Sequence, residues 1–167
     1  MPPLTETAAL LRFGLLHGYV SVPEVIAWAD AEIAARAHPH PALLEVSTAG
    51  RRTPADLASE LGPLVEGCGE AEIVDRVFAL MHRALSRDQS LARRIASTLY
   101  SFAIADTLPS GGDPEGWMLY FDDALDLAHD DVSGTVDAVV QEMLRFLTPY
   151  ANLAPERGAE RDVRPGS

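Results

Sequence analysis

The sequence contains no lysine and only one cysteine, Cys68. All 13 basic residues are arginines, which is typical of a protein encoded by a GC-rich bacterial genome. A single cysteine excludes an internal disulfide and agrees with a reducing compartment. It lies in Gly-Cys-Gly after a short apolar stretch, a setting that favours a structural residue over a nucleophile.

Long apolar runs are also missing from the sequence, so no segment is expected to span a bilayer. The apolar part near the N-terminus, from Ala8 to Val20, is interrupted by Arg12 and His17. Neither a basic start nor a small-residue cleavage site accompanies it, as a signal peptide would require. We therefore expect a cytoplasmic protein that binds no membrane.

Basic residues are absent from one long segment, between Arg94 and Arg145. The same segment holds ten carboxylates: Asp106, Asp113, Glu115, Asp122, Asp123, Asp126, Asp130, Asp131, Asp137 and Glu142. With a net charge of −12, the chain should repel nucleic acid and attract a protein with a basic surface. The alternative is that this acidity only keeps the protein soluble.

Motifs that carry chemistry are missing as well. We find no Gly-x-Ser-x-Gly elbow, no phosphate-binding loop and no basic helix-turn-helix. Asp126-x-x-His129 has the spacing used in di-metal helical bundles, but the sequence offers no second such pair. We expect no metal, no cofactor and no enzymatic activity.

What the sequence does contain is helical patterning. Residues 91–106 read LARRIASTLYSFAIAD and are uncharged from Ile95 to Ala105. Apolar side chains cover much of such a helix, with Tyr100 and Ile104 extending the stripe, so we expect other helices to surround it. This segment is therefore predicted to be the central helix.

Start and stop signals delimit the other helices. Ser21-Val-Pro-Glu24 and Thr53-Pro-Ala-Asp56 each have a capping residue, a proline and an acid in the order typical of a helix start. No stretch alternates like a half-buried strand. The fold class predicted is all-α, a single compact bundle of about seven to eight helices over residues 1–154. Residues 155–167 are polar and are predicted to form a flexible tail.

The helix predicted after Pro114 places carboxylates on one face. Asp122, Asp126 and Asp130 recur at four-residue spacing, and Asp123 flanks them. Like charges at this spacing destabilise a helix by a few tenths of a kcal/mol per pair, a cost that a cationic partner would remove. These four residues are our candidate partner-binding site. The alternative interpretation is a solvated face opposite the apolar side.

Five arginines cluster in sequence around one predicted turn between helices. They are Arg76, Arg83, Arg87, Arg93 and Arg94. If they pair with the acidic C-terminal half inside the fold, the acidic surface is less exposed than the residue count indicates.

Two segments carry a family resemblance. The first segment reads GYVSVPEVIAWADAEIA followed by HPALLEVSTAG, and the second reads LYFDDALDLAHDD followed by SGTVDAVVQEMLRFLTPY. They resemble small acidic all-helical bacterial proteins of unknown function. Chains of this kind are similar to the immunity proteins of bacterial toxin systems, which neutralise a toxin by binding it. The resemblance implies a binding function and carries no active-site residue.

The expected function is thus a non-enzymatic protein-binding module, of the immunity type if the resemblance holds, that uses its acidic helix against a basic protein. A second hypothesis is an enzyme or small-ligand binder with an interhelical pocket near Trp28, Tyr100 or Trp117. A third is a homodimer, which a large exposed apolar patch would reveal.

Overall fold

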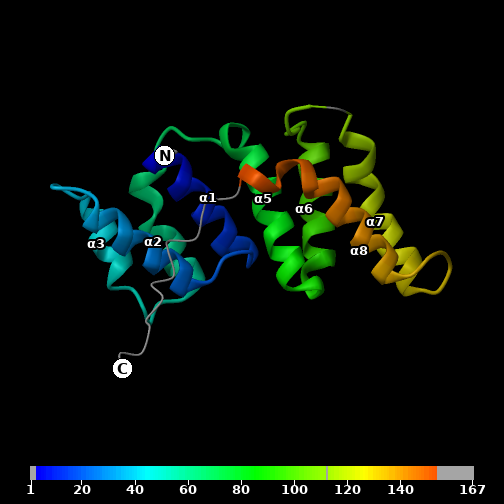
Figure 1. Ribbon diagram of the computed structural model, residues 1–167, viewed down its shortest axis with the longest axis horizontal. Coiled ribbons are helices and arrows are strands. Elements are labelled where there is room, and N and C mark those ends of the chain that lie inside the picture. The colour runs from blue at the N-terminus through cyan, green and yellow to red at the C-terminus, as the bar shows by residue number, and fades with distance from the viewer. Residues whose placement is uncertain (1–2, 112, 154–167) are drawn as a thin grey trace, which may run out of the picture.

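A computed structural model describes residues 3–111 and 113–153, and within them it contains helices and no strand (Figure 1). The α-helices are α1 (Leu4–His17), α2 (Val22–Ala34), α3 (Pro41–Ser47), α4 (Pro54–Glu60), α5 (Glu70–Arg87), α6 (Ala92–Ile104), α7 (Glu115–His129) and α8 (Val136–Leu147). The 3-10 helices are η1 (Gly62–Leu64), η2 (Gln89–Leu91) and η3 (Thr148–Leu153). The all-α prediction is confirmed. The tail predicted for 155–167 lies outside the described residues.

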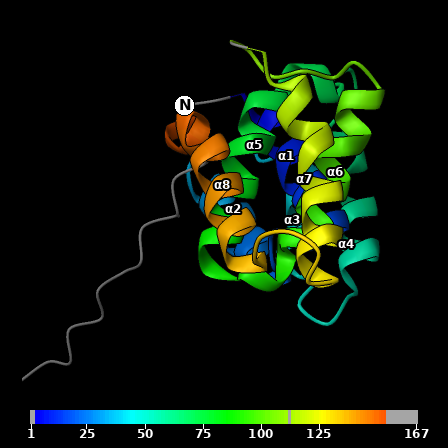
Figure 2. The same cartoon turned by 90° about the vertical axis from the view of Figure 1, so that its right-hand side faces the viewer.

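The helices form two groups along the long axis of the molecule (Figure 1), and in the view along that axis α7 and α8 lie in front (Figure 2). In the first group, α1 packs on α4 and α2 packs on α3. In the second, α6 packs on α7, α7 on α8, and α8 on α5. The contact of α1 with α5 joins the groups, and one continuous hydrophobic core runs through both.

The central position belongs to α5 rather than to residues 91–106. Helix α5 contacts α1, α6, α8 and η3, and its buried residues lie on more than one side. Helix α6 is covered on one side only, since Tyr100 is 44% exposed and Ile104 is 67% exposed. The length of α5, 18 residues, lets it reach both groups, whereas α6 has 13. The absence of charge from Ile95 to Ala105 therefore did not predict which helix is the most enclosed.

The predicted start signals operate as hydrogen-bonded caps. The backbone N–H of Ser21 donates to the Glu24 carboxylate at 2.9 Å, and Thr53 and Asp56 form an equivalent capping box. Gly18 ends α1 in the left-handed region at φ 71°. After α8 the chain continues as η3, so Pro149 ends the α-helix but not the helical path.

The turn after α1 is bound tightly to α6. Tyr19 is 1% exposed, and its hydroxyl lies 2.8 Å from the Thr98 hydroxyl. The Arg94 guanidinium donates to the His17 carbonyl at 3.0 Å, and Arg87 donates to the Tyr19 carbonyl at 3.3 Å.

Among the described residues, no helix combines the length and the apolar character needed to cross a membrane.

Candidate functional site

The predicted acidic face lies on α7, on the side toward α6. Asp123, Asp126 and Asp130 are exposed, and Asp122 is half-buried. The opposite side of α7, with Met118, Phe121, Ala124, Leu125 and Ala128, is buried in the core. This burial fixes the rotation of the helix, so the carboxylates must face outward along one edge. We refer to Asp122, Asp123, Asp126 and Asp130 as the acidic row.

One arginine from the neighbouring helix reaches the acidic row. Arg93 on α6 forms an ion pair with Asp126, in which the two side chains are 49% and 61% exposed. The hydrogen bond to Asp126 raises the pKa of Arg93, and the charges of Asp126, Asp122 and Asp130 add to that effect while slight burial opposes it. One cation therefore interacts with three of the four carboxylates and neutralises only part of their charge.

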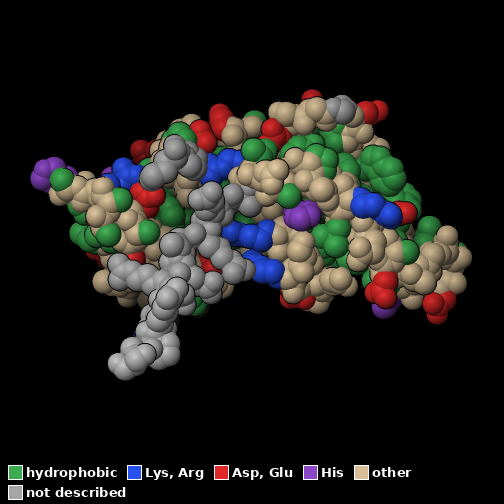
Figure 3. All heavy atoms as spheres, viewed as in Figure 1, with side chains coloured by type: hydrophobic (Ala, Val, Ile, Leu, Met, Phe, Trp, Pro, Cys, Tyr) green, Lys and Arg blue, Asp and Glu red, His purple; other side chains and the backbone are tan. Residues whose placement is uncertain are grey.

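Two other arginines form ion pairs with glutamates of the first group of helices, on α1 and α2. Arg76 pairs with Glu6 at 3.4 Å, and Arg87 pairs with Glu24 at 2.9 Å. Figure 3 shows arginine side chains gathered in the middle of one face, where the two groups of helices meet. The arginines around the α5–α6 turn thus bind the halves together, and Arg93 is the member whose ion pair lies on the acidic row.

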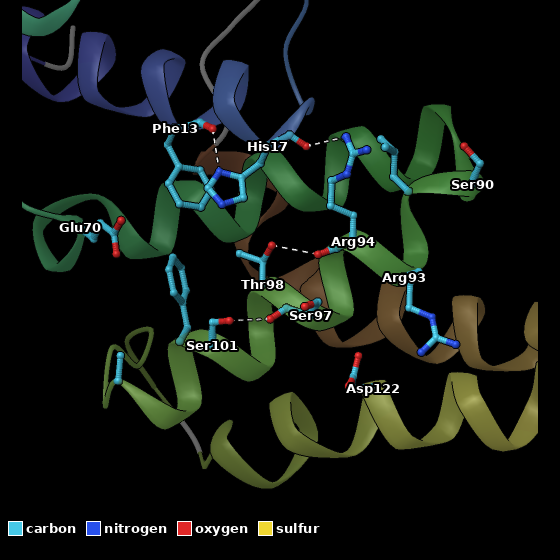
Figure 4. A pocket seen from close by; sticks show the side chains of 13 residues that line it. Phe13, His17, Glu70, Ser90, Arg93, Arg94, Ser97, Thr98, Ser101 and Asp122 are labelled. Carbon is cyan, nitrogen blue, oxygen red and sulfur yellow. Dashed lines mark hydrogen bonds between the residues drawn. The ribbon is translucent and has the colours of Figure 1, made fainter. Parts of the chain in front are cut away.

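A groove of about 870 Å³ lies where α1, α6 and the start of α5 come together (Figure 4). Its polar lining includes His17, Glu70, Arg93, Arg94, Ser97 and Asp122. Asp122 connects this groove to the acidic row. No pattern in the sequence predicts the groove, because its lining residues come from four helices, α1, α5, α6 and α7, and meet only in the folded chain.

The groups in the groove are held by structural contacts. His17 stacks on Phe13 with ring centroids 4.0 Å apart, and its Nδ1 lies 3.0 Å from the Phe13 carbonyl. The hydroxyls of Thr98 and Ser101 donate to helix carbonyls at 2.9 Å. In the described part of the chain, no hydrogen bond joins His17 to a serine, so the groove offers polar recognition without a base positioned on a nucleophile.

The three residues proposed for a ligand pocket occupy separate places. Trp28 is half-buried on α2 and packs against the core, Tyr100 is exposed on α6, and Trp117 is 49% exposed on α7. None of the three lines the large groove. Trp117 instead lines two smaller hollows between α7 and α8, of about 410 and 370 Å³.

Metal and thiol chemistry find little support in the described residues. They contain no group of three or more His, Cys, Asp or Glu side chains arranged to hold a metal ion. Asp126, the first residue of the candidate Asp-x-x-His pair, is bound to Arg93. Burial raises the pKa of the Cys68 thiol, and the charges of Glu72 and Glu6 raise it further, which disfavours the reactive thiolate.

The sequence predicted the acidic row and named Trp117 as a pocket residue, but Tyr120 beside it was missed. Trp117 and Tyr120 stand three residues apart, and that spacing alone places them on one helix face. Both rings are about half exposed, and the sequence does not show how α8 packs beside them.

Comparisons with protein-family models, with curated proteins and with solved structures find no match. The resemblance to immunity proteins therefore stays a prediction.

Proposed function

We propose that this chain is a non-enzymatic protein-binding module that recognises a basic protein surface through the acidic row of α7. The observation that carries the proposal is the exposure of three row carboxylates beside a single paired cation, Arg93. Helix α7 gains nothing from like charges at four-residue spacing, whereas a basic partner would convert their repulsion into attraction. An immunity-type inhibitor is the form of this function that the sequence resemblance favours.

The test compares two variants that lose the same charge. One carries Asp122→Asn, Asp126→Asn and Asp130→Asn, and the control carries Glu45→Gln, Glu66→Gln and Glu72→Gln. The three control glutamates are exposed and lie outside α7. Binding of an oligo-arginine peptide is measured by calorimetry at increasing salt concentrations.

We expect the row variant to raise the Kd about tenfold and to flatten its dependence on salt. The control should keep the wild-type salt dependence and most of the affinity. Equal losses in both variants would mean that the peptide responds to net charge alone, and the proposal would fall. The product of a neighbouring gene is the first natural partner to titrate.

A second candidate function is small-ligand binding in the large groove. The observation that favours it is a volume of about 870 Å³ lined by polar groups from four helices, within the size range of small-molecule sites. Ser97→Leu would fill part of this groove at an exposed position. A small molecule that raises the Tm of the wild type but not of Ser97→Leu would support this function, and a uniform response would oppose it.

A further inference from the structure

Two exposed aromatic rings meet two carboxylates at the start of α7. The hollow of about 410 Å³ is lined by Asp113, Gly116, Trp117, Tyr120 and Glu142, and we refer to these residues as the aromatic hollow. Trp117 is 49% exposed and Tyr120 is 46% exposed. Their ring centroids lie 5.7 Å apart and their planes stand at 87°, so they form two perpendicular walls.

The walls are held in place from both helices. The Tyr120 hydroxyl donates to the Glu142 carboxylate on α8 at 3.5 Å. The Trp117 ring contacts Phe121, which is fully buried, with ring centroids 5.8 Å apart. Gly116 has no side chain, and a Cβ there would meet nothing within 4 Å. The hollow is therefore open on its Gly116 side.

The charge of the aromatic hollow is negative. Among the described residues, its lining holds the carboxylates of Asp113 and Glu142 and no basic side chain. Arg145 lines the neighbouring hollow of about 370 Å³, on the Phe146 side of Trp117, and forms no ion pair with Glu142. Arg145 thus borders the second hollow, which shares Trp117 and Glu142 with the first, while the described lining of the first presents aromatic faces and carboxylates to solvent.

Aromatic faces with adjacent carboxylates fit a planar cation. A guanidinium stacks on an indole or phenol ring and can also donate to a carboxylate at its edge. An ammonium carries a tightly held hydration shell and lacks the flat surface that stacks. We propose that the aromatic hollow is a subsite for one arginine side chain of the basic partner, an inference that rests on the proposed function.

The aromatic hollow and the acidic row lie on the two flanks of α7, the hollow toward α8 and the row toward α6. Asp123 follows Tyr120 by three residues and so lies on the next turn of the same helix face. Six residues separate Tyr120 from Asp126, so Asp126 lies about 9 Å further along the axis and about 120° around the helix, with Asp123 between them. A basic segment that crosses the exposed face of α7 would reach both, with one arginine in the hollow and others on the row.

The experiment uses Trp117 as its reporter. In a Trp28→Phe background, Trp117 is the only tryptophan of the chain. The protein is titrated with a short glycine-flanked peptide that contains one arginine, and separately with the same peptide containing citrulline or lysine. Citrulline keeps the shape of arginine without its charge. The indole N–H resonances of the wild-type chain give the same reading without the background substitution.

We expect the arginine peptide to change the Trp117 signal saturably and more strongly than the lysine peptide, and the citrulline peptide to have no effect. Glu142→Gln should raise the Kd about fivefold. Asp137→Asn removes the same charge from an exposed position on α8 and should leave the Kd unchanged.

Three results would overturn the inference. They are equal binding of the citrulline peptide, equal or tighter binding of the lysine peptide, and equal effects of Glu142→Gln and Asp137→Asn. These results are separable from the proposed function. If the row variant loses oligo-arginine binding while Glu142→Gln changes nothing, the acidic row stands and the aromatic hollow falls. If only Glu142→Gln has an effect, the acidic row falls.

Discussion

The hydroxyl of Tyr19 lies 2.8 Å from that of Thr98, although 79 residues separate them in the chain. Thr98 also donates to the Arg94 carbonyl at 2.9 Å, so the phenol and the first turns of α6 form one hydrogen-bonded unit. This contact joins the α1 turn to the C-terminal group of helices, and it involves a phenol that is almost fully buried.

Burial raises the pKa of Tyr19 from its ordinary value of 10.0 to about 12, because it outweighs the hydrogen bond with Thr98 and the charge of Arg94, which lower it. The folded state thus keeps this proton to higher pH than the unfolded chain. The resulting stability is fully present below pH 10 and is lost as the pH rises through about 12, by roughly 2–3 kcal/mol.

The measurement is the free energy of unfolding in denaturant between neutral pH and pH 12, for the wild type and Tyr19→Phe. Burial also raises the pKa of Tyr150, with Asp75 adding to the effect, so the wild type alone mixes two groups. The difference between the two proteins isolates Tyr19. This difference should shrink at high pH. A difference that stays constant would show that Tyr19 ionises as freely in the folded chain as in the unfolded chain.

The surroundings of Gly14 and Gly116 predict opposite effects of substitution by alanine. A Cβ on Gly14 would lie 2.5 Å from Val20 Cγ2 and 2.9 Å from Leu80 Cδ2, so Gly14→Ala should destabilise the fold by about 1–3 kcal/mol. A Cβ on Gly116 meets nothing, and that position is helical, so Gly116→Ala should stabilise by about 0.5–1 kcal/mol. Thermal unfolding of the two variants checks both signs. Stabilisation by Gly14→Ala would contradict the close approach at that position, and destabilisation by Gly116→Ala would contradict the open space at the start of α7.

Removing Arg93 should change binding more than stability. Its ion pair with Asp126 is half exposed, and exposed pairs contribute about 0–1 kcal/mol. A cation in the first turn of α6 also opposes the helix dipole, which offsets part of that contribution. Arg93→Met should therefore unfold within about 1 kcal/mol of the wild type and bind the oligo-arginine peptide more tightly. Weaker binding would indicate that Arg93 itself helps to form the site.

The cap of α2 should contribute stability that depends on pH. Burial raises the pKa of Glu24, but hydrogen bonds from Ser21 and Arg87 outweigh it and the net pKa is lowered from 4.5. A lowered pKa gives stability that is present above pH 4.5 and lost as the pH falls through the folded-state value. Ser21→Ala should cost about 1 kcal/mol at neutral pH and less in acid. Denaturant unfolding of the wild type and Ser21→Ala at neutral and acid pH measures this cost. A cost that does not change with pH would show that the cap does not depend on the ionisation of Glu24.

Local signals in the sequence predicted local structure well. The capping boxes at Ser21 and Thr53 and the stop at Gly18 depend on residues within a few positions of one another, and each forms as the sequence indicates. The acidic row is a local property too, since helical spacing alone puts Asp122, Asp126 and Asp130 on one face. What the spacing does not fix is the neighbour of that face.

The sequence by itself determined the helical segments, the helix ends at Gly18, Ser21 and Thr53, and the charge along α7, because each depends on residues close in the chain. Tertiary packing decided that α5 rather than α6 is central, that Arg93 reaches the acidic row, and that Trp117 and Tyr120 stay exposed beside Glu142. These are contacts between separate helices, and hydrophobic burial, which drives their packing, has no direction of its own. Only the shapes of the assembled helices select which side chains meet.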